Sequence, residues 1–236
     1  MNKSDIFKAL ITVLKSEQIR TDMEFKPDQA KLQINSSISK TGLTILGIGM
    51  YSVVVEHEAH PGRVFKVSTS RWDGYRAYAK YCIEHAGEPL IPNVYSAQEQ
   101  GNFAWYELEK YYPCTLTELS STGRVQHHNN KIRDIVNMVQ AATHGPSSCE
   151  YQLKHNTITR GMRKPKRDQY LNELREYINH ARKIYNTFED THRLDLHFGN
   201  IMITSEHEVV ITDPLANDLR REIPVTEVDP EFEDCV

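Results

Sequence analysis

Long apolar runs are absent from the sequence. The longest, residues 6–14, is interrupted by Lys8 and Thr12, so it falls short of the ~18 apolar residues that a membrane-spanning helix requires. The amino terminus also lacks the basic segment and long apolar core of a secretory signal. We therefore expect a protein that does not associate with a membrane.

The sequence also has few cysteines and no excess of positive charge. The formal net charge is -4, whereas proteins that bind nucleic acids usually carry a basic excess. The cysteines show no paired spacing, which argues against a disulfide framework and against a zinc site of the CxxC type. We expect reduced thiols and no direct nucleic-acid binding. The four cysteines are Cys82, Cys114, Cys149 and Cys235.

Hydrophobic pattern divides the chain into two unlike parts. An amphipathic helix is expected near the amino terminus, and the polar residues 21–40 predict a linker. Short β-branched and aromatic runs follow, separated by glycine and proline turns, with one helix at about residues 75–85. The expected strands are residues 43–46, 51–57, 63–68, 94–98 and 103–108.

Beyond Pro113 the pattern becomes mainly helical. Apolar residues recur at helical spacing in residues 130–143 and 168–186. A β-rich segment followed by a helix-rich segment predicts an α+β protein of two lobes. We therefore expect an amino-terminal helix and linker, an antiparallel β lobe with one helix, a helical lobe, and an acidic tail. Their ranges are residues 1–40, 41–112, 113–220 and 221–236.

Two features of the β-rich part could bind an anion. Gly47 and Gly49 lie in a turn between two strands, where glycine lets backbone N–H groups approach phosphate oxygens. A tight turn without a ligand explains the same residues. Lys66 lies inside the apolar strand Val64–Val67, where it either pairs with an anion in a cleft or extends along the surface.

Two features of the carboxyl-terminal third could support group transfer. Asp195 and Asn200 bracket a short loop that runs into a strand. At that separation, the carboxylate can accept a proton and the amide can hold a metal ion, although an Asx turn is an alternative. Asp213 ends an apolar strand, where it is placed either to bind Mg²⁺ or only to terminate the strand before Pro214.

The order of these four features resembles the protein-kinase-like fold: glycine turn, strand lysine, helix, Asp-x4-Asn loop and strand aspartate. The chain resembles more closely the early serine/threonine protein kinase of short-tailed coliphages. The sequence segments that carry this resemblance are residues 91–95, 195–202 and 211–214. The resemblance implies a two-lobed fold with a small antiparallel β lobe and a shortened helical lobe.

The resemblance also implies the roles of individual residues. Asp195 would be the catalytic base, Lys66 would hold the α and β phosphates of ATP, and Asn200 and Asp213 would bind Mg²⁺. Residues from Glu107 to Tyr111 would be the hinge whose backbone meets adenine. The remaining residues expected at the nucleotide are Gly47, Gly49, Ser52, Val54, Glu107, Glu109 and, as the partner of Lys66, Glu84.

The sequence departs from that pattern at several points. Ser52 replaces the third loop glycine, and Asp213 is followed by Pro214 rather than by Phe-Gly. Glu84 lies near the end of its helix, so Asp73 is the other candidate for the partner of Lys66.

By resemblance, the chain transfers the γ-phosphate of Mg-ATP to serine and threonine hydroxyls, its own included, in the host cytoplasm. Its substrates would be host bacterial proteins, with RNA polymerase and RNA-processing or translation proteins among them. Residues 195–201 also resemble the D-L-H-x-G-N-I loop of aminoglycoside and choline kinases. We expect the stretch after Asp213 to be too short for the substrate pocket of those enzymes. A pseudokinase-like binding module is the third alternative.

Overall fold

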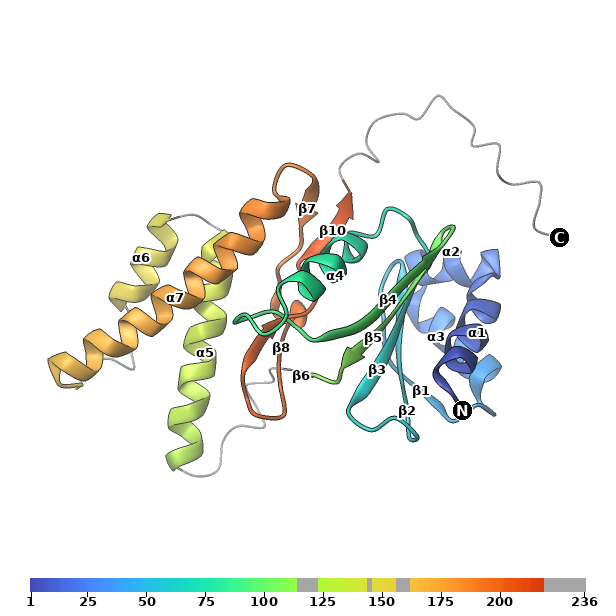
Figure 1. Ribbon diagram of the computed structural model, residues 1–236, viewed down its shortest axis with the longest axis horizontal. Helices are drawn as coiled ribbons and strands as arrows, with labels where there is room; N and C mark the ends of the chain where they lie inside the picture. Colours follow the sequence, from blue (N-terminus) through green and yellow to red (C-terminus); the bar gives the residue numbers. More distant parts are fainter. Residues whose placement is uncertain (114–122, 144–145, 156–161, 219–236) are drawn as a thin grey trace.

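The computed structural model describes residues 1–113, 123–143, 146–155 and 162–218 (Figure 1). The expected acidic tail, residues 221–236, lies outside the described residues. The helices are α1 (Lys3–Leu14), α2 (Glu17–Phe25), α3 (Pro27–Ile38), α4 (Tyr75–Glu84), α5 (Gly123–Thr143), α6 (Pro146–His155) and α7 (Lys164–Phe188), with the 3₁₀ turn η1 (Phe198–Asn200).

The strands form three antiparallel sheets. A five-stranded sheet has the order β1-β2-β3-β5-β4, a three-stranded sheet β6-β8-β9, and a two-stranded sheet β10-β7. This arrangement confirms the expected α+β class and each of the five strands expected before Pro113. The strands are β1 (Leu43–Ile48), β2 (Ser52–His57), β3 (Arg63–Ser68), β4 (Val94–Gln100), β5 (Phe103–Glu109), β6 (Tyr112–Pro113), β7 (His192–Leu194), β8 (Ile201–Ile203), β9 (Val209–Ile211) and β10 (Leu215–Asp218).

The expected linker at residues 21–40 is wrong, because the segment forms most of two helices. Ser16 caps α2 by accepting a hydrogen bond from the backbone N–H of Ile19, and Pro27 occupies the first turn of α3. Most polar residues are exposed, whereas Asp22 is buried and accepts a hydrogen bond from Nε2 of Gln33 at 2.9 Å. Met23 and Ile34 are buried on the inner faces, so a sparse apolar stripe is enough to hold both helices.

Helices α1–α3 cover one face of the five-stranded sheet (Figure 1). Their apolar side chains form a core with Phe65 and Val67 of β3. Successive strand residues point to opposite faces, so Val64 and Lys66 of the same strand point to the other face, where a second core joins the sheet to α4 and the helical lobe. The β lobe is therefore a sheet between two apolar layers.

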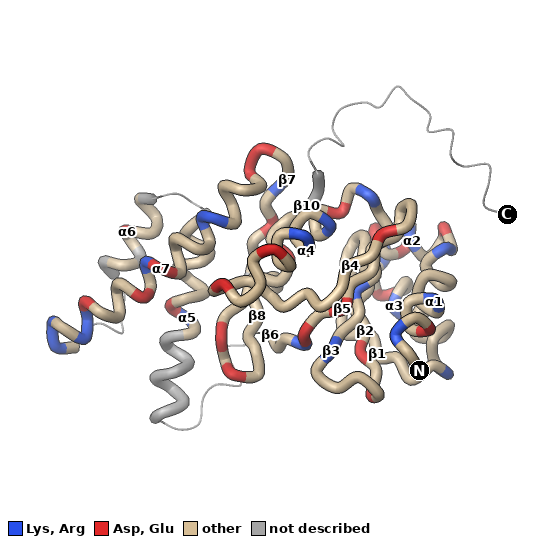
Figure 2. The backbone as a smooth tube through the Cα atoms, in the orientation of Figure 1, with Lys and Arg blue, Asp and Glu red and all other residues tan. Residues whose placement is uncertain are grey.

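The helical lobe is built on α5 and α7, which pack against each other. The segments expected to be helical, residues 130–143 and 168–186, lie within these two helices, whereas α6 was not expected. Figure 2 shows acidic and basic residues interspersed over both lobes, with a run of basic residues at the amino-terminal end of α7. Among the described residues, no helix combines the length and apolar character needed to cross a membrane.

Candidate functional site

A cleft of about 420 Å³ lies between the five-stranded sheet and the segment η1–β9. Its walls come from β1, β2 and β3, from the connection between the lobes at residues 108–113, and from η1, β8 and the end of β9. Small-molecule sites commonly have volumes of roughly 300–1,000 Å³, so a single nucleotide-sized ligand fits. The expected site residues that line the cleft are Gly47, Val54, Lys66, Glu109, Asn200 and Asp213.

The glycine turn at the cleft is closed by its own backbone. The N–H of Gly49 donates to the carbonyl oxygen of Ser52 at 2.8 Å. A Cβ atom at Gly47 would meet no atom within 4 Å, so the open space there faces the cleft. Gly49 and Ser52 shape the turn and do not line the cavity, whereas Val54, which pairs with Lys66 across the strands, does.

Lys66 is buried and bound to an aspartate from the other lobe. Its Nζ donates to Oδ2 of Asp213 at 2.7 Å and lies 3.4 Å from the ring centroid of Tyr75. The Lys66 side chain is 5% exposed and that of Asp213 is 34% exposed. The cation is therefore fixed in the protein, while the carboxylate remains accessible from the cleft.

The expected pairing of Lys66 with Glu84 is wrong. Glu84 is the last residue of α4 and is exposed. Tyr75, at the start of the same helix, faces Lys66, and nine positions at 3.6 residues per turn place Glu84 roughly 180° away from it around the helix. Helix geometry thus directs Glu84 away from the site.

Asp73 lies two residues before the start of α4 and is 7% exposed. Its Oδ1 accepts a hydrogen bond from the backbone N–H of Tyr75 at 3.0 Å. Its Oδ2 and the Oδ1 of Asp213 find no hydrogen-bond partner among the described residues. Burial raises the pKa of the Asp213 carboxyl group; Lys66 opposes that shift and the negative charge of Asp73 adds to it. The site therefore holds more buried negative charge than Lys66 alone neutralises.

These oxygen atoms suit a hard divalent cation. Mg²⁺ usually binds one or two carboxylates and completes its octahedron with water and substrate phosphates. Asp213 and Asn200 both line the cleft, and Oδ1 of Asp213 is a buried oxygen without a hydrogen-bond partner among the described residues. In the part of the chain that the structure describes, no three His, Cys, Asp or Glu side chains group to hold a metal. The residues thus fit a metal that arrives with phosphates.

The loop between β7 and β8 is fixed to the Asp213 segment by backbone hydrogen bonds. The N–H of Asp195 donates to the carbonyl oxygen of Pro214 at 2.7 Å, and the N–H of Thr212 donates to that of Asn200 at 2.8 Å. The side-chain Nδ2 of Asn200 donates to the carbonyl oxygen of Asp195 at 2.7 Å. The Asp195 carboxylate is 51% exposed and lies beside the cleft rather than among its lining residues.

His197 stabilises this loop. Its Nδ1 accepts a hydrogen bond from the N–H of Gly199 at 3.0 Å, and its Nε2 lies 3.9 Å from Oδ2 of Asp195. A Cβ atom at Gly199 would come within 2.8 Å of the His197 ring, so a larger residue there would require that exposed ring to shift.

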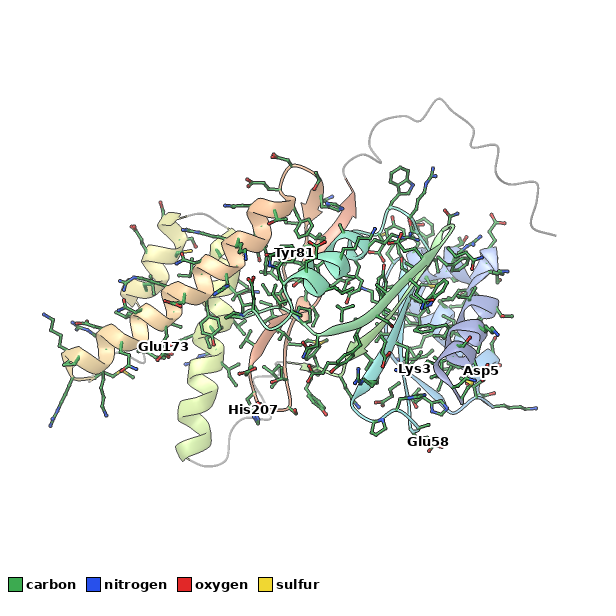
Figure 3. The ribbon with its side chains drawn as sticks, in the orientation of Figure 1. Lys3, Asp5, Glu58, Tyr81, Glu173 and His207 are labelled. Carbon is green, nitrogen blue, oxygen red and sulfur yellow. The ribbon has the colours of Figure 1, made fainter. Side chains whose placement is uncertain are left out.

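The expected placement of Glu107 at the nucleotide is wrong. Glu107 pairs with Phe65 across β3 and β5, so its side chain points to the helix-covered face, opposite Lys66. There its Oε2 accepts a hydrogen bond from Lys3 of α1 at 2.8 Å, and Arg63 lies 3.4 Å from its Oε1. Figure 3 labels Lys3 beside the sheet. The cleft side of the hinge begins one residue later, at Leu108.

Glu109 does line the cleft, but its carboxylate is already bonded. Its Oε2 accepts hydrogen bonds from Nδ2 of Asn93 at 2.6 Å and from the hydroxyl of Tyr111 at 3.2 Å. Sequence reasoning missed the apolar part of the lining. Strand alternation from Lys66, with the pairing of β3 and β5, is the signal that finds Val64 and Leu108. Tyr75 of α4 and Met202 of β8 reach the lining through the tertiary fold, for which the sequence carries no such signal.

The family model described as Bacteriophage T7 protein kinase 0.7 matches residues 10–233. No curated protein matches the chain. A solved structure of a thermostable aminoglycoside phosphotransferase mutant, in ternary complex with AMP-PNP and hygromycin B, aligns at a TM-score of 0.32 and 13% identity, covering 77% of this chain and 70% of that chain. Another mutant of the same enzyme, with ADP and hygromycin B, aligns at 0.31 and 14% over the same shares.

Proposed function

Because the chain belongs to the bacteriophage T7 protein kinase family, a family of phosphotransferases, we propose that it transfers the γ-phosphate of ATP to serine and threonine hydroxyls of host bacterial proteins. The observation that carries the proposal is the pairing of buried Lys66 with Asp213 in the cleft. Residues 147 positions apart meet there, beside the loop that carries Asp195 and Asn200.

The adenine ring has an apolar place in the cleft. Val54, Val64 and Leu108 on the five-stranded sheet and Met202 of β8 contribute apolar side chains to one cavity. Flat aromatic rings bind well between such side chains, with a few polar groups setting their orientation. Residues 109–112 border the same cavity, and their backbone groups can provide those polar contacts.

The phosphates belong at the inner end, where the charged side chains are. Lys66 presents an oriented cation at 3.4 Å from the Tyr75 ring, and a fixed cation binds phosphate without reorganisation. Asn200 and Asp213 would hold Mg²⁺, which when bound neutralises charge between the β and γ phosphates.

Asp195 is placed to take the proton of the attacking hydroxyl. Its half-exposed carboxylate is accessible to a hydroxyl presented from outside the cavity, which suits a side chain on another protein. The backbone bonds to Pro214 and Asn200 fix its position. Positioning and proton acceptance together are commonly worth ~10²–10⁴-fold or more in rate.

The same access allows modification of the chain itself. The family assignment supports a bacteriophage protein. We propose that it acts in the host cytoplasm, with the host transcription machinery and RNA-processing or translation proteins as substrates. A small-molecule phosphotransferase is the alternative that a specific feature favours, since residues 195–201 match the D-L-H-x-G-N-I loop of that class.

One experiment separates these functions. The purified chain is incubated with γ-labelled ATP, with Mg²⁺ or with EDTA, in three arms: alone, with bacterial lysate, and with a panel of aminoglycosides and amino alcohols. We expect Mg²⁺-dependent labelling of lysate proteins at serine and threonine, shown by phosphoamino-acid analysis. Labelling confined to the small molecules would establish the alternative. No labelling in any arm would favour a binding module without catalysis.

A further inference from the structure

The amino-terminal end of α7 carries positive charge that the fold of one chain does not account for. This end projects beyond α5 and α6 (Figure 1), and residues 163–169 are all exposed. The positive end of a helix dipole disfavours cations, yet the first turn contains basic residues and no acidic one. Among the described residues, the one ion pair that these cations form joins Arg167 to Asp168 at 3.7 Å. The cations are Arg163, Lys164, Lys166 and Arg167.

A groove of about 770 Å³ begins directly after this end of the helix. The described residues that line it come from one side of α7, between positions 169 and 180, and from Pro89 in the loop after α4. They include the carboxylates of Glu173 and Glu176 and no lysine or arginine. Leu174 and Ile178, which join α7 to the core, lie on a different side of the helix. The groove therefore presents negative charge on a face of α7 that the core does not use.

Lys66's counterpart in charge on this helix, Lys166, lies on the same side of α7 as the groove. Positions 166, 169, 173, 176 and 180 follow one another at alternating intervals of three and four residues, so they form a single stripe along the helix. Lys166 and Glu176 lie ten residues apart in this stripe, or about 15 Å along the helix axis. That separation is too large for the two side chains to pair within one chain.

The stripe is complementary to a second copy of itself in the antiparallel orientation. A two-fold axis midway between Gln169 and Glu173 places Lys166 of each copy opposite Glu176 of the other, and Gln169 opposite Glu173. Because a two-fold interface makes every contact twice, it would contain two ion pairs and two amide–carboxylate hydrogen bonds. A parallel pair would instead place each of these residues opposite its own equivalent, with like charges in contact.

We propose that the stripe of α7 from Lys166 to His180 is the contact surface of a homodimer in which two copies of α7 pack antiparallel. The dimer places the exposed, basic end of one helix in the acidic groove of the other, which neutralises cations at the positive end of the dipole. Surface ion pairs each contribute little, so the dimer is weak and dissociates as the salt concentration rises. No described residue lines both this groove and the nucleotide cleft, so the proposal does not depend on the proposed function.

The test reverses one charge at a time. Sedimentation velocity of the full chain, over a range of protein concentrations and at low and high salt, compares Lys166→Glu and Glu176→Lys with the unaltered protein. Each substitution places like charges opposite each other twice in the dimer, so each should weaken association by roughly tenfold. Lys164→Glu is the matched control. It changes the net charge equally, but Lys164 lies roughly 160° around the helix from Lys166, so association should be unchanged.

Mixing the two variants tests the pairing itself. When a Lys166→Glu chain meets a Glu176→Lys chain, both opposed positions again join opposite charges. The mixture should therefore associate within about threefold of the unaltered protein, although neither variant does so alone. Circular dichroism confirms that each exposed substitution leaves the helix content unchanged. An unaltered protein that stays monomeric at every concentration, an equal effect of Lys164→Glu, or a mixture that associates no better than its components would overturn the proposal.

Discussion

The two faces of the five-stranded sheet carry similar apolar residues but have different roles. On the helix-covered face, Phe65 stacks edge-on against Phe7 of α1 with ring centroids 5.5 Å apart, and Val67 is fully buried. On the cleft face, Lys66 lies between them in sequence and carries a buried charge. The comparison indicates that one strand supplies packing to one layer and an oriented cation to the other.

Each face also holds an acid, and the two acids differ in the number of cations beside them. Neither Oε1 of Glu107 nor Oδ1 of Asp213 has a hydrogen-bond partner among the described residues. Lys3 and Arg63 nevertheless lie 2.8 and 3.4 Å from Oε1 of Glu107, which is buried on the helix-covered face. Asp213 at the cleft is 34% exposed and has the single cation Lys66, on Oδ2. Two cations neutralise Glu107 within the fold, whereas Asp213 retains an oxygen atom that a ligand can use.

The largest expected effect is on the cleft side, at the catalytic loop. Asp195→Asn keeps the size of the side chain and removes the proton acceptor, so phosphate transfer should fall by ~10²–10⁴-fold. ADP binding should remain within a factor of about three, because the carboxylate lies outside the cavity lining. Single-turnover transfer beside ADP titration gives both values. Transfer within a few-fold of the unaltered protein would remove Asp195 from the mechanism.

The next largest effect is on the helix-covered face, and it should alter stability rather than chemistry. Phe65→Ala removes a fully buried ring from the contact with α1 and should lower the free energy of unfolding by about 3–5 kcal/mol. Urea denaturation measures this loss. ADP affinity, measured well below the melting temperature, should be nearly unchanged. A loss of less than about 1 kcal/mol would show that the helices do not stabilise the sheet.

The smallest effect is expected where the loop after α4 meets α7. Glu88 binds Lys183 and His85 at 2.9 and 2.8 Å, and these bonds lower its pKa to about 2. A carboxyl group whose pKa is lowered by folding stabilises the protein above its unfolded pKa of ~4.3, and that stabilisation disappears as the pH falls. The melting temperature of Glu88→Gln should therefore be slightly lower at neutral pH, and the difference should shrink below about pH 4. A difference independent of pH and salt would contradict this account.

The sequence predicted local features more successfully than contacts between faces and lobes. The strand pattern and glycine turn depend on neighbouring residues, and so does the placement of Lys66 within an apolar strand; these are visible in sequence. The face of β5 on which Glu107 lies depends on register with β3, and the pairing of Lys66 with Asp213 depends on how the lobes meet. The hydrophobic pattern of the sequence did not indicate helices at α2 and α3, because the apolar stripe of each helix includes few residues.

The central claim is that Lys66 binds the phosphates of a nucleotide in the cleft. Lys66→Met keeps the length and apolar stem of the side chain and removes its charge. Thermal melting is measured beside transfer of γ-labelled phosphate to lysate proteins and to the chain itself. We predict a protein that still folds, with a melting temperature lowered because Asp213 loses its paired cation, and transfer reduced by orders of magnitude, because the cation stabilises charge on the phosphates. Normal melting with normal transfer would contradict the assignment of the cleft as the nucleotide site.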